Sequence, residues 1–172
     1  MEKNSIYNIP IVALKNKEHH FEYKIDGEFF KYFDNKTIND CDIEVKISLE
    51  KRDSVFVLLF YIDGKIKLAC DRCLDIYSQE IFGDYKLIIQ LDGEINQDND
   101  NDDDIILIAR NSDYLDVSKP IYDYILLSIP IQRTHSDKGD CNRDILEHFT
   151  NSKQEIKDID PRWDALKKIK NK

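Results

Sequence analysis

Residues 42–49 alternate between polar and apolar side chains. The apolar members are Ile43, Val45, Ile47 and Leu49. A period of two places successive side chains on opposite faces of a β-strand, so this segment predicts a strand with one buried face. Residues 21–25 show a shorter version of the same alternation and predict a second strand.

Further apolar runs predict a β-rich structure for the first two thirds of the chain. Residues 55–62 form a more continuous apolar and aromatic run, which indicates a strand covered on both faces. Asp63-Gly64 separates this run from residues 65–69, and an Asp-Gly pair in this position favours a two-residue hairpin turn. Two later apolar runs predict further strands, at residues 85–91 and 105–109.

Helical signals gather mainly in the C-terminal third. Ser118 precedes a run over residues 119–128 with apolar side chains at three- and four-residue spacing, and Pro120 lies in the first turn, where its missing N–H costs nothing. Few positions in the run are polar, so we expect this helix to be largely buried against the sheet and to end at Pro130. Two more helices are predicted, over residues 141–149 and from Asp160 onward.

Residues 26–33 could be the second arm of a hairpin or a short helix, and the spacing of Phe29, Phe30 and Phe33 favours the helix. The pattern as a whole predicts an α+β fold. We expect antiparallel β-sheets or a partly closed β-barrel in the N-terminal two thirds, with helices packed toward the C-terminal third. The expected organisation is one domain over residues 1–149, a linker over 150–159 and a C-terminal helix over 160–172.

The charge of the chain is acidic and unevenly distributed. Acidic residues outnumber basic ones 34 to 25, which gives a formal net charge of −9 and a sequence pI of about 4.9. Residues 92–104 hold seven acidic residues without Lys or Arg, and this like-charged, weakly apolar stretch predicts a mobile loop. Proteins that grip nucleic acid through its phosphates usually present a basic face. The charge therefore favours a basic protein as the partner.

The N-terminus and the longest apolar run bear on the cellular compartment. The N-terminus lacks a basic segment followed by an apolar one, so no secretory signal is predicted. Residues 55–62, the longest apolar run, are too few to cross a bilayer. We therefore expect a cytosolic protein without a membrane partner. In that compartment the four cysteines are expected as thiols or metal ligands rather than as disulfides.

The most specific local feature is the pair Cys70 and Cys73, which follows a predicted strand directly. Two thiolates at this spacing can bind one metal ion from a tight turn, which is why the spacing recurs in zinc sites. His135 and Cys141, in a polar loop that contains a glycine, could supply the other two ligands. Three sulfurs and one imidazole form a closed structural zinc set, which contributes to folding and leaves no position open for a substrate.

Two other interpretations of the cysteine pair stay open. Free cysteines are readily buried, so Cys70 and Cys73 could serve packing alone. A redox-active pair is the second alternative, although Cys73 does not open a helix after a parallel strand. Cys41, at the start of a strand, is expected to take no part in the site.

Motifs of common catalytic machinery are absent from the sequence. None of the 5 glycines falls in a phosphate-loop pattern, and neither Gly-x-Ser-x-Gly nor His-Glu-x-x-His occurs. The aspartates of residues 92–104 lack the regular spacing and closing Glu of a calcium loop. An enzyme is therefore not expected.

Several motifs in order resemble those of the large ribosomal RNA subunit accumulation (YceD-type) family. Residues 70–74 are similar to the family's Cys-x-x-Cys-Leu turn, and residues 126–130 to its apolar helix that ends in Leu-Ser-Leu-Pro. His135 and Cys141 fall where members carry a His or Cys pair. Residues 160–166 resemble the family's C-terminal Asp-Pro-Arg-Trp-x-x-Leu. The matches span about residues 40–169.

The resemblance implies a bacterial factor in the synthesis, processing or stability of large-subunit ribosomal RNA, without a defined catalytic activity. Because the chain is acidic, we expect this factor to act through a protein partner, either a basic ribosomal protein or a large-subunit assembly factor. The last predicted helix would add an accessory contact through Trp163, Arg162, Lys167 and Lys168. Trp163 could instead simply attach that helix to the body of the protein.

Two alternative functions predict different behaviour. A direct rRNA-binding module would use residues 153–172, where seven basic and four acidic residues give +3, together with exposed aromatic rings that stack on single-stranded bases. A zinc-dependent or thiol redox enzyme would lose turnover when Cys70 or Cys73 is replaced. A structural zinc site would instead lose folding stability.

Overall fold

The computed structural model describes residues 6–92, 105–109 and 112–152. The chain forms two compact units. The first, here called the sheet unit, comprises residues 1–68 and 77–133. The second, called the knuckle unit, comprises residues 69–76 and 134–172.

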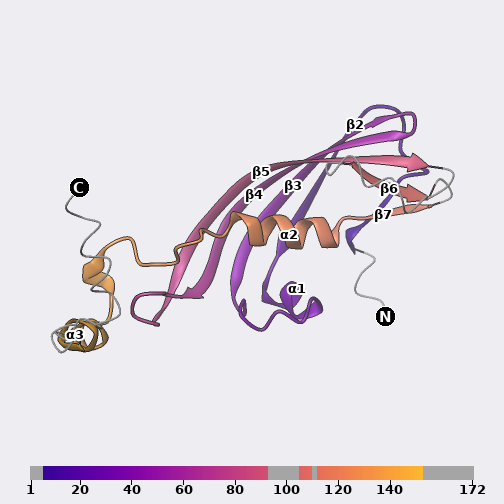
Figure 1. Ribbon diagram of the computed structural model, residues 1–172. Coiled ribbons are helices and arrows are strands. Elements are labelled where there is room, and N and C mark those ends of the chain that lie inside the picture. The colour runs from indigo at the N-terminus through magenta and orange to yellow at the C-terminus, as the bar shows by residue number, and fades with distance from the viewer. Residues whose placement is uncertain (1–5, 93–104, 110–111, 153–172) are drawn as a thin grey trace, which may run out of the picture. The chain divides into compact units, whose positions relative to one another are not determined.

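Five strands form the main sheet, in the order β2-β3-β4-β5-β6 (Figure 1). Their bounds are Glu18–Ile25 for β2, Cys41–Arg52 for β3, Val55–Ala69 for β4, Ile76–Asp92 for β5 and Ile105–Ala109 for β6. β3 pairs antiparallel with both β2 and β4, whereas β6 pairs parallel with β5. Parallel neighbours cannot be joined by a two-residue hairpin, in contrast to antiparallel ones.

The sheet is open, so the expected alternative of a partly closed barrel is wrong. Its described strand order ends at β2 on one side and at β6 on the other. The expectation of antiparallel pairing is confirmed for β2, β3 and β4, and for a separate two-stranded sheet of β1 (Asn8–Pro10) and β7 (Tyr114–Asp116). The parallel β6 strand makes the main sheet mixed.

The two described helices of the sheet unit begin differently, and only α1 has a side-chain cap. α1 (Gly27–Tyr32) starts after Asp26, whose carboxylate accepts a backbone hydrogen bond from the first turn. Of the two alternatives for residues 26–33, the helix is therefore confirmed and the second arm of a hairpin is wrong. α2 (Ser118–Ser128) includes Ser118, which was expected to precede it. Val117 occupies the N-cap position and makes no side-chain cap hydrogen bond. The Asp116 carboxylate, one residue earlier, accepts from the Ser118 N–H at 2.8 Å.

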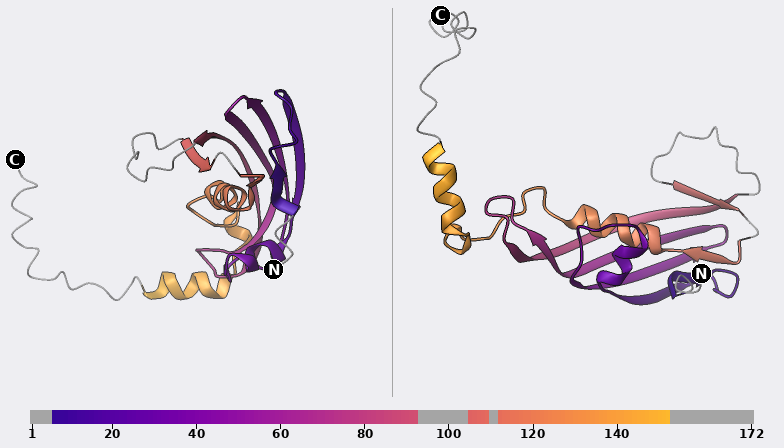
Figure 2. Two further views of the ribbon diagram at one scale, coloured as in Figure 1. Left: turned by 90° about the vertical axis from the view of Figure 1, so that its right-hand side faces the viewer. Right: turned by 90° about the horizontal axis from the view of Figure 1, so that it is seen from below.

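α1 and α2 cover the same, concave face of the sheet (Figure 2). Tyr124 of α2 meets Phe60 with ring centroids 5.0 Å apart and stacks on Tyr85 of β5 at 4.5 Å. Phe33, which follows α1, stacks on Tyr122 of α2 at 4.3 Å. These contacts join both helices and the sheet into one apolar core, which confirms that α2 packs against the sheet. Because α1 lies near the N-terminus, the helices are not confined to the C-terminal third.

β4 is covered on one face only, so the expectation of cover on both faces of residues 55–62 is wrong. Phe56, Leu58 and Phe60 point inward and are fully buried. Leu59 and Tyr61 point outward and are 36% and 45% exposed. The outward side chains made the run look continuously apolar although they do not belong to the core.

The predicted hairpin turn at Asp63-Gly64 is also wrong, because β4 continues through it to Ala69. Gly64 pairs with Ile43 of β3. A Cβ atom at Gly64 would lie 2.3 Å from the Asp42 carbonyl oxygen. The glycine therefore permits a close approach of two backbones rather than a turn.

α3 (Arg143–Ser152) lies in the knuckle unit and corresponds to the helix expected over residues 141–149. It begins later than expected, after Asn142, whose side chain accepts a hydrogen bond from the Asp144 N–H at 3.2 Å. Residues 150–152, expected in a linker, belong to this helix.

Several predicted features lie outside the described residues. They are residues 93–104 of the acidic segment 92–104, the remainder of the expected linker, the C-terminal helix over 160–172 and its residues Trp163, Arg162, Lys167 and Lys168. Asp92, the first residue of the acidic segment, ends β5 and so is not in a loop. Within the described ranges, no helix combines the length and apolar character that a membrane crossing requires.

We expect Gly64→Ala to lower the free energy of unfolding by about 1–3 kcal/mol, because the added methyl group would force β3 and β4 apart. Chemical denaturation of the full chain measures the change. Gly139→Ala is the matched control, because its added Cβ would meet Asp137 at an ordinary contact distance of 3.5 Å. Equal stability of the two variants would contradict the close-approach interpretation.

Candidate metal centre

Four side chains with metal-binding atoms meet within the knuckle unit. They are Cys70, Cys73, His135 and Cys141, and their ligand atoms all lie within 4.8 Å of one another. The two halves are more than 60 residues apart in sequence, with 62 residues from Cys73 to His135. The structure thus brings together all four residues that the sequence suggested as a metal site.

The first two ligands lie on a tight turn between β4 and β5. The Cys70 N–H donates to the Asp75 carbonyl at 2.9 Å, and the Leu74 N–H donates to the Cys70 carbonyl at 2.9 Å. Leu74 has a φ of 65°, in the left-handed region that closes the turn. The turn holds Cys70 and Cys73 fully buried, as a two-cysteine zinc knuckle requires.

The second pair of ligands lies on the loop before α3. A short 3-10 turn over Lys138–Asp140 brings the chain back between His135 and Cys141. Asp137 holds this turn, because its carboxylate accepts a hydrogen bond from the Gly139 N–H at 2.8 Å. Cys141 is 4% exposed.

The distances around His135 fit a tetrahedral zinc site. Its Nδ1 atom lies 3.6 Å from the Sγ atoms of both Cys73 and Cys141. With zinc–sulfur bonds of about 2.3 Å and zinc–nitrogen bonds of about 2.0 Å, sulfur and nitrogen ligands of a tetrahedral ion lie about 3.5 Å apart. The four side chains therefore need little movement to bind one ion.

The described residues of the knuckle unit form no apolar core of their own. Among its described residues, the only buried side chains are those of Cys70, Cys73 and Cys141. The apolar residues of its turn face solvent, with Leu74 69% and Ile76 66% exposed. A unit this small needs a substitute for hydrophobic burial, and a bound metal ion is a common one.

Arg72, between the two knuckle cysteines, stabilises negative charge on the sulfurs. Its backbone N–H lies 3.4 Å from the Cys70 Sγ atom, and its guanidinium Nη1 donates to the Cys141 Sγ atom at 3.4 Å. Hydrogen bonds from outside the ligand set orient thiolates and offset their charge. Sequence reasoning did not single out Arg72, although its position inside the Cys-x-x-Cys segment is the available signal.

Two thiols of the cluster have pKa values shifted in opposite directions. Burial raises the pKa of the Cys70 thiol, but hydrogen bonds from the Arg72, His135 and Cys73 backbones and from the His135 side chain outweigh it and lower the pKa to about 6. Burial, followed by the hydrogen bond with Cys73, raises the pKa of Cys141. One sulfur is thus a thiolate near neutral pH, ready for a cation, and metal binding would displace the proton of Cys141.

Cys41 stands apart from the cluster, in agreement with the expectation. It lies at the start of β3 in the sheet unit, and its thiol donates to the Ile25 carbonyl at 3.7 Å. Burial, with smaller effects of Asp26 and other nearby acids, raises its pKa to about 12. Cys41 is therefore protonated at neutral pH and unsuited to metal binding.

Comparison with protein families identifies a family that this chain matches. The sequence model of the family described as "Large ribosomal RNA subunit accumulation protein YceD" matches residues 58–170. The matched region includes all four residues of the candidate metal centre. Comparisons with curated proteins and with solved structures found no significant match.

We expect the purified chain to bind about one zinc ion and Cys73→Ser to lose it, because a hydroxyl is a poor replacement for a thiolate ligand. The variant should also melt at a lower temperature, as should the chelator-treated wild type. Elemental analysis and thermal melting measure the two effects. Cys41→Ser is the matched control and should retain both the metal and the melting temperature. Zinc content that is equal in the two variants would exclude the site.

We also expect the reduced, metal-free chain, at a temperature below its lowered melting point, to carry one buried thiolate between about pH 6 and the ordinary thiol value of 9.0. Because the pKa of Cys70 is lowered, this thiolate is present above about pH 6 and is lost as the pH falls below it. The ultraviolet absorbance of thiolate, followed during a pH titration, measures the transition. Cys70→Ser should abolish it and Cys41→Ser should not. A transition unchanged in Cys70→Ser would contradict the assignment.

Proposed function

We propose that this chain, which belongs to the large ribosomal RNA subunit accumulation protein YceD family, supports the accumulation of large-subunit ribosomal RNA as a non-enzymatic factor that acts through a protein partner. The family match over residues 58–170 carries this proposal. A role in ribosome assembly would be carried out in the cytoplasm.

The candidate metal centre supports a structural rather than a catalytic role for these ligands. Three thiolates and one imidazole complete the tetrahedral coordination of zinc, which leaves no position for a water or a substrate. The knuckle unit has no buried apolar side chain among its described residues, so an ion bound there would contribute to folding. A second cluster of potential metal ligands does not occur in the described part of the chain.

The charge of the chain supports a protein partner. With a net charge of −9, the protein would be repelled by RNA phosphates at long range and attracted by basic proteins. A basic ribosomal protein or a basic large-subunit assembly factor fits this charge. Large-subunit rRNA would then accumulate because its protein partner is delivered or retained, without extensive contact between this chain and the RNA.

We expect the tagged full chain, purified gently from its host, to migrate in a sucrose gradient with immature large-subunit particles or with a basic large-subunit protein. Depletion of the chain should lower the ratio of large-subunit to small-subunit rRNA. Mass spectrometry of the fractions and rRNA quantification measure the two effects.

The tag expressed alone is the control for nonspecific recovery. Recovery of the chain only in free fractions, with the rRNA ratio unchanged after depletion, would refute the proposed function. Loss of co-migration after RNase treatment and after deletion of residues 153–172 would instead favour direct rRNA binding.

A further inference from the structure

The convex face of the main sheet carries aromatic side chains that none of the described helices and strands of the sheet unit covers. α1 and α2 lie on the opposite, concave face (Figure 2). Phe82 in the middle of β5 is 82% exposed, and Tyr61 of β4 is 45% exposed. They line a shallow pocket of about 320 Å³ on this face. Large aromatic side chains exposed in the middle of a sheet often mark a binding surface.

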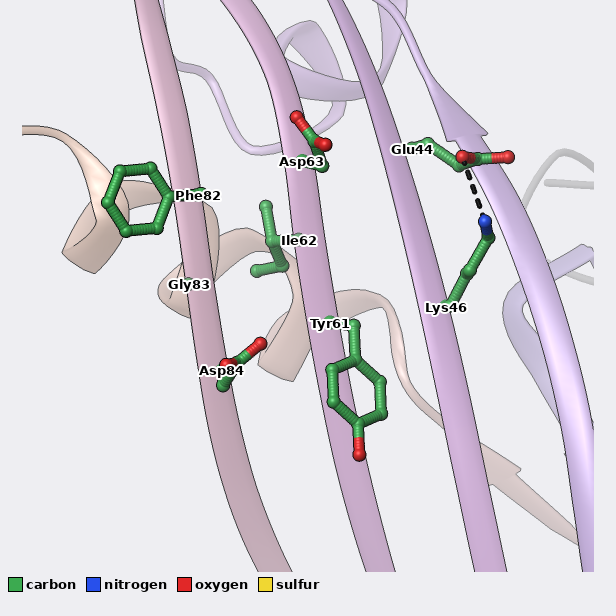
Figure 3. A pocket seen from close by; sticks show the side chains of 8 residues that line it. All are labelled: Glu44, Lys46, Tyr61, Ile62, Asp63, Phe82, Gly83 and Asp84. Atoms are coloured by element: carbon green, nitrogen blue, oxygen red, sulfur yellow. Dashed lines mark ion pairs between the residues drawn. The ribbon is translucent and has the colours of Figure 1, made fainter.

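Each aromatic residue of this pocket lies level with an acidic residue of the neighbouring strand, and the Phe82 ring extends away from β4 (Figure 3). Asp63 of β4 lies level with Phe82 of β5, and Asp84 of β5 lies level with Tyr61 of β4 (Figure 3). The four side chains form an alternating arrangement of two rings and two acids. α2 passes behind the sheet in this view, so the arrangement faces away from the core.

The carboxylates of the pocket outnumber the cationic side chains that could pair with them. Glu44 of β3 lies directly opposite Asp63 in the sheet register, and like charges in such positions repel. Lys46 pairs with Glu44 at 3.2 Å. Within the described ranges neither Asp63 nor Asp84 forms an ion pair.

The next pair of outward positions on the same two strands shows a balanced arrangement. There Lys65 of β4 pairs with Glu80 of β5 at 3.1 Å. At one level the sheet therefore supplies its own cation. At the adjacent levels an aromatic residue of one strand stands level with an acidic residue of the other (Figure 3). This leaves room for a cation from outside between Asp63 and Asp84.

We propose that this pocket, lined by Tyr61, Asp63, Phe82 and Asp84, binds an arginine side chain of an extended, basic segment of a protein partner. A guanidinium group can stack on an aromatic ring while it donates hydrogen bonds to a carboxylate, which suits a surface where the two alternate. The volume of about 320 Å³ lies at the small end of ligand sites, which suits one long side chain rather than a large ligand.

Charge complementarity favours this occupant over others. The lining holds three carboxylates, from Glu44, Asp63 and Asp84, and one ammonium group, from Lys46. RNA phosphates would be repelled by this set, and a second copy of the chain would bring the same acids to the interface. The inference rests on the proposed function for the identity of the partner, whereas the location and chemistry of the site rest on the sheet face.

Titration of the full chain with an oligo-arginine peptide, followed by amide NMR shifts at near-physiological salt, tests the site. We expect shifts at β4 and β5 around the pocket. Phe82→Ala and Asp63→Asn/Asp84→Asn should each weaken binding about fivefold or more. Both variants change exposed side chains, and removal of the repulsion between Asp63 and Glu44 should leave the melting temperature unchanged or slightly higher.

Asp34→Asn/Asp113→Asn is the matched control, because it removes the same charge from two exposed residues that do not line the pocket. This control should bind like the wild type. Equal weakening by both double variants, or shifts spread over all acidic surfaces, would overturn the site in favour of nonspecific attraction. Equally strong binding of a single-stranded RNA oligonucleotide at the same residues would overturn it as well.

The sucrose gradient separates failure of this inference from failure of the proposed function. If the wild type migrates with large-subunit particles and Phe82→Ala does so equally, the pocket is not the docking site and the proposed function stands. If the wild type remains free but the peptide binding depends on the pocket, the site stands and the proposed function fails.

Discussion

The one-sided burial of the main sheet is the constraint on which the sheet unit depends. The inward side chains of β3 and β4 are packed under α2, and Tyr124 contacts both Phe60 and Tyr85 there. Fully burying a large apolar side chain contributes about 1.5–3 kcal/mol, so the concave face can stabilise this unit alone. The convex face is consequently free to carry side chains that add little to stability. Phe82, 82% exposed, is the clearest case.

The knuckle unit depends on a different interaction. Its described buried side chains are three cysteines, and a cluster of thiols contributes little hydrophobic free energy compared with a core of branched side chains. Two chain segments far apart in sequence converge on these sulfurs, so the ordering entropy must be offset by something other than packing. A closed zinc site can supply it, since the free energy of metal binding is then folding free energy. The lowered pKa of Cys70 reduces the cost of deprotonating that ligand.

The sequence was sufficient to predict elements whose signals are local. The alternation in residues 42–49, the helical spacing of Phe29, Phe30 and Phe33 and the ligand types of the metal cluster all survive in the structure. The predictions were wrong where contacts with a segment distant in sequence determine the local structure. Gly64 follows an aspartate, as in a hairpin turn, but the β3 backbone beside it is what requires a glycine. Likewise, nothing local in residues 55–62 reveals that one apolar stripe faces solvent, because the cover is provided by α2. The sequence did not indicate a role for Arg72, because its hydrogen bond to Cys141 joins residues that lie 69 positions apart.

A net acidic protein can serve RNA accumulation if charge and shape act at different stages of recognition. The excess charge of −9 attracts any basic protein from a distance and speeds its approach, but it cannot select one. Selection requires a site where a cation loses water and meets defined partners, and aromatic rings beside carboxylates provide such a site. The pocket on β4 and β5 combines both on strands whose positions are fixed by the core behind them. The recognition proposed for this face would therefore need no rearrangement of the sheet. Substitutions on opposite faces of the same strands could then alter the stability of the fold and the specificity of binding independently.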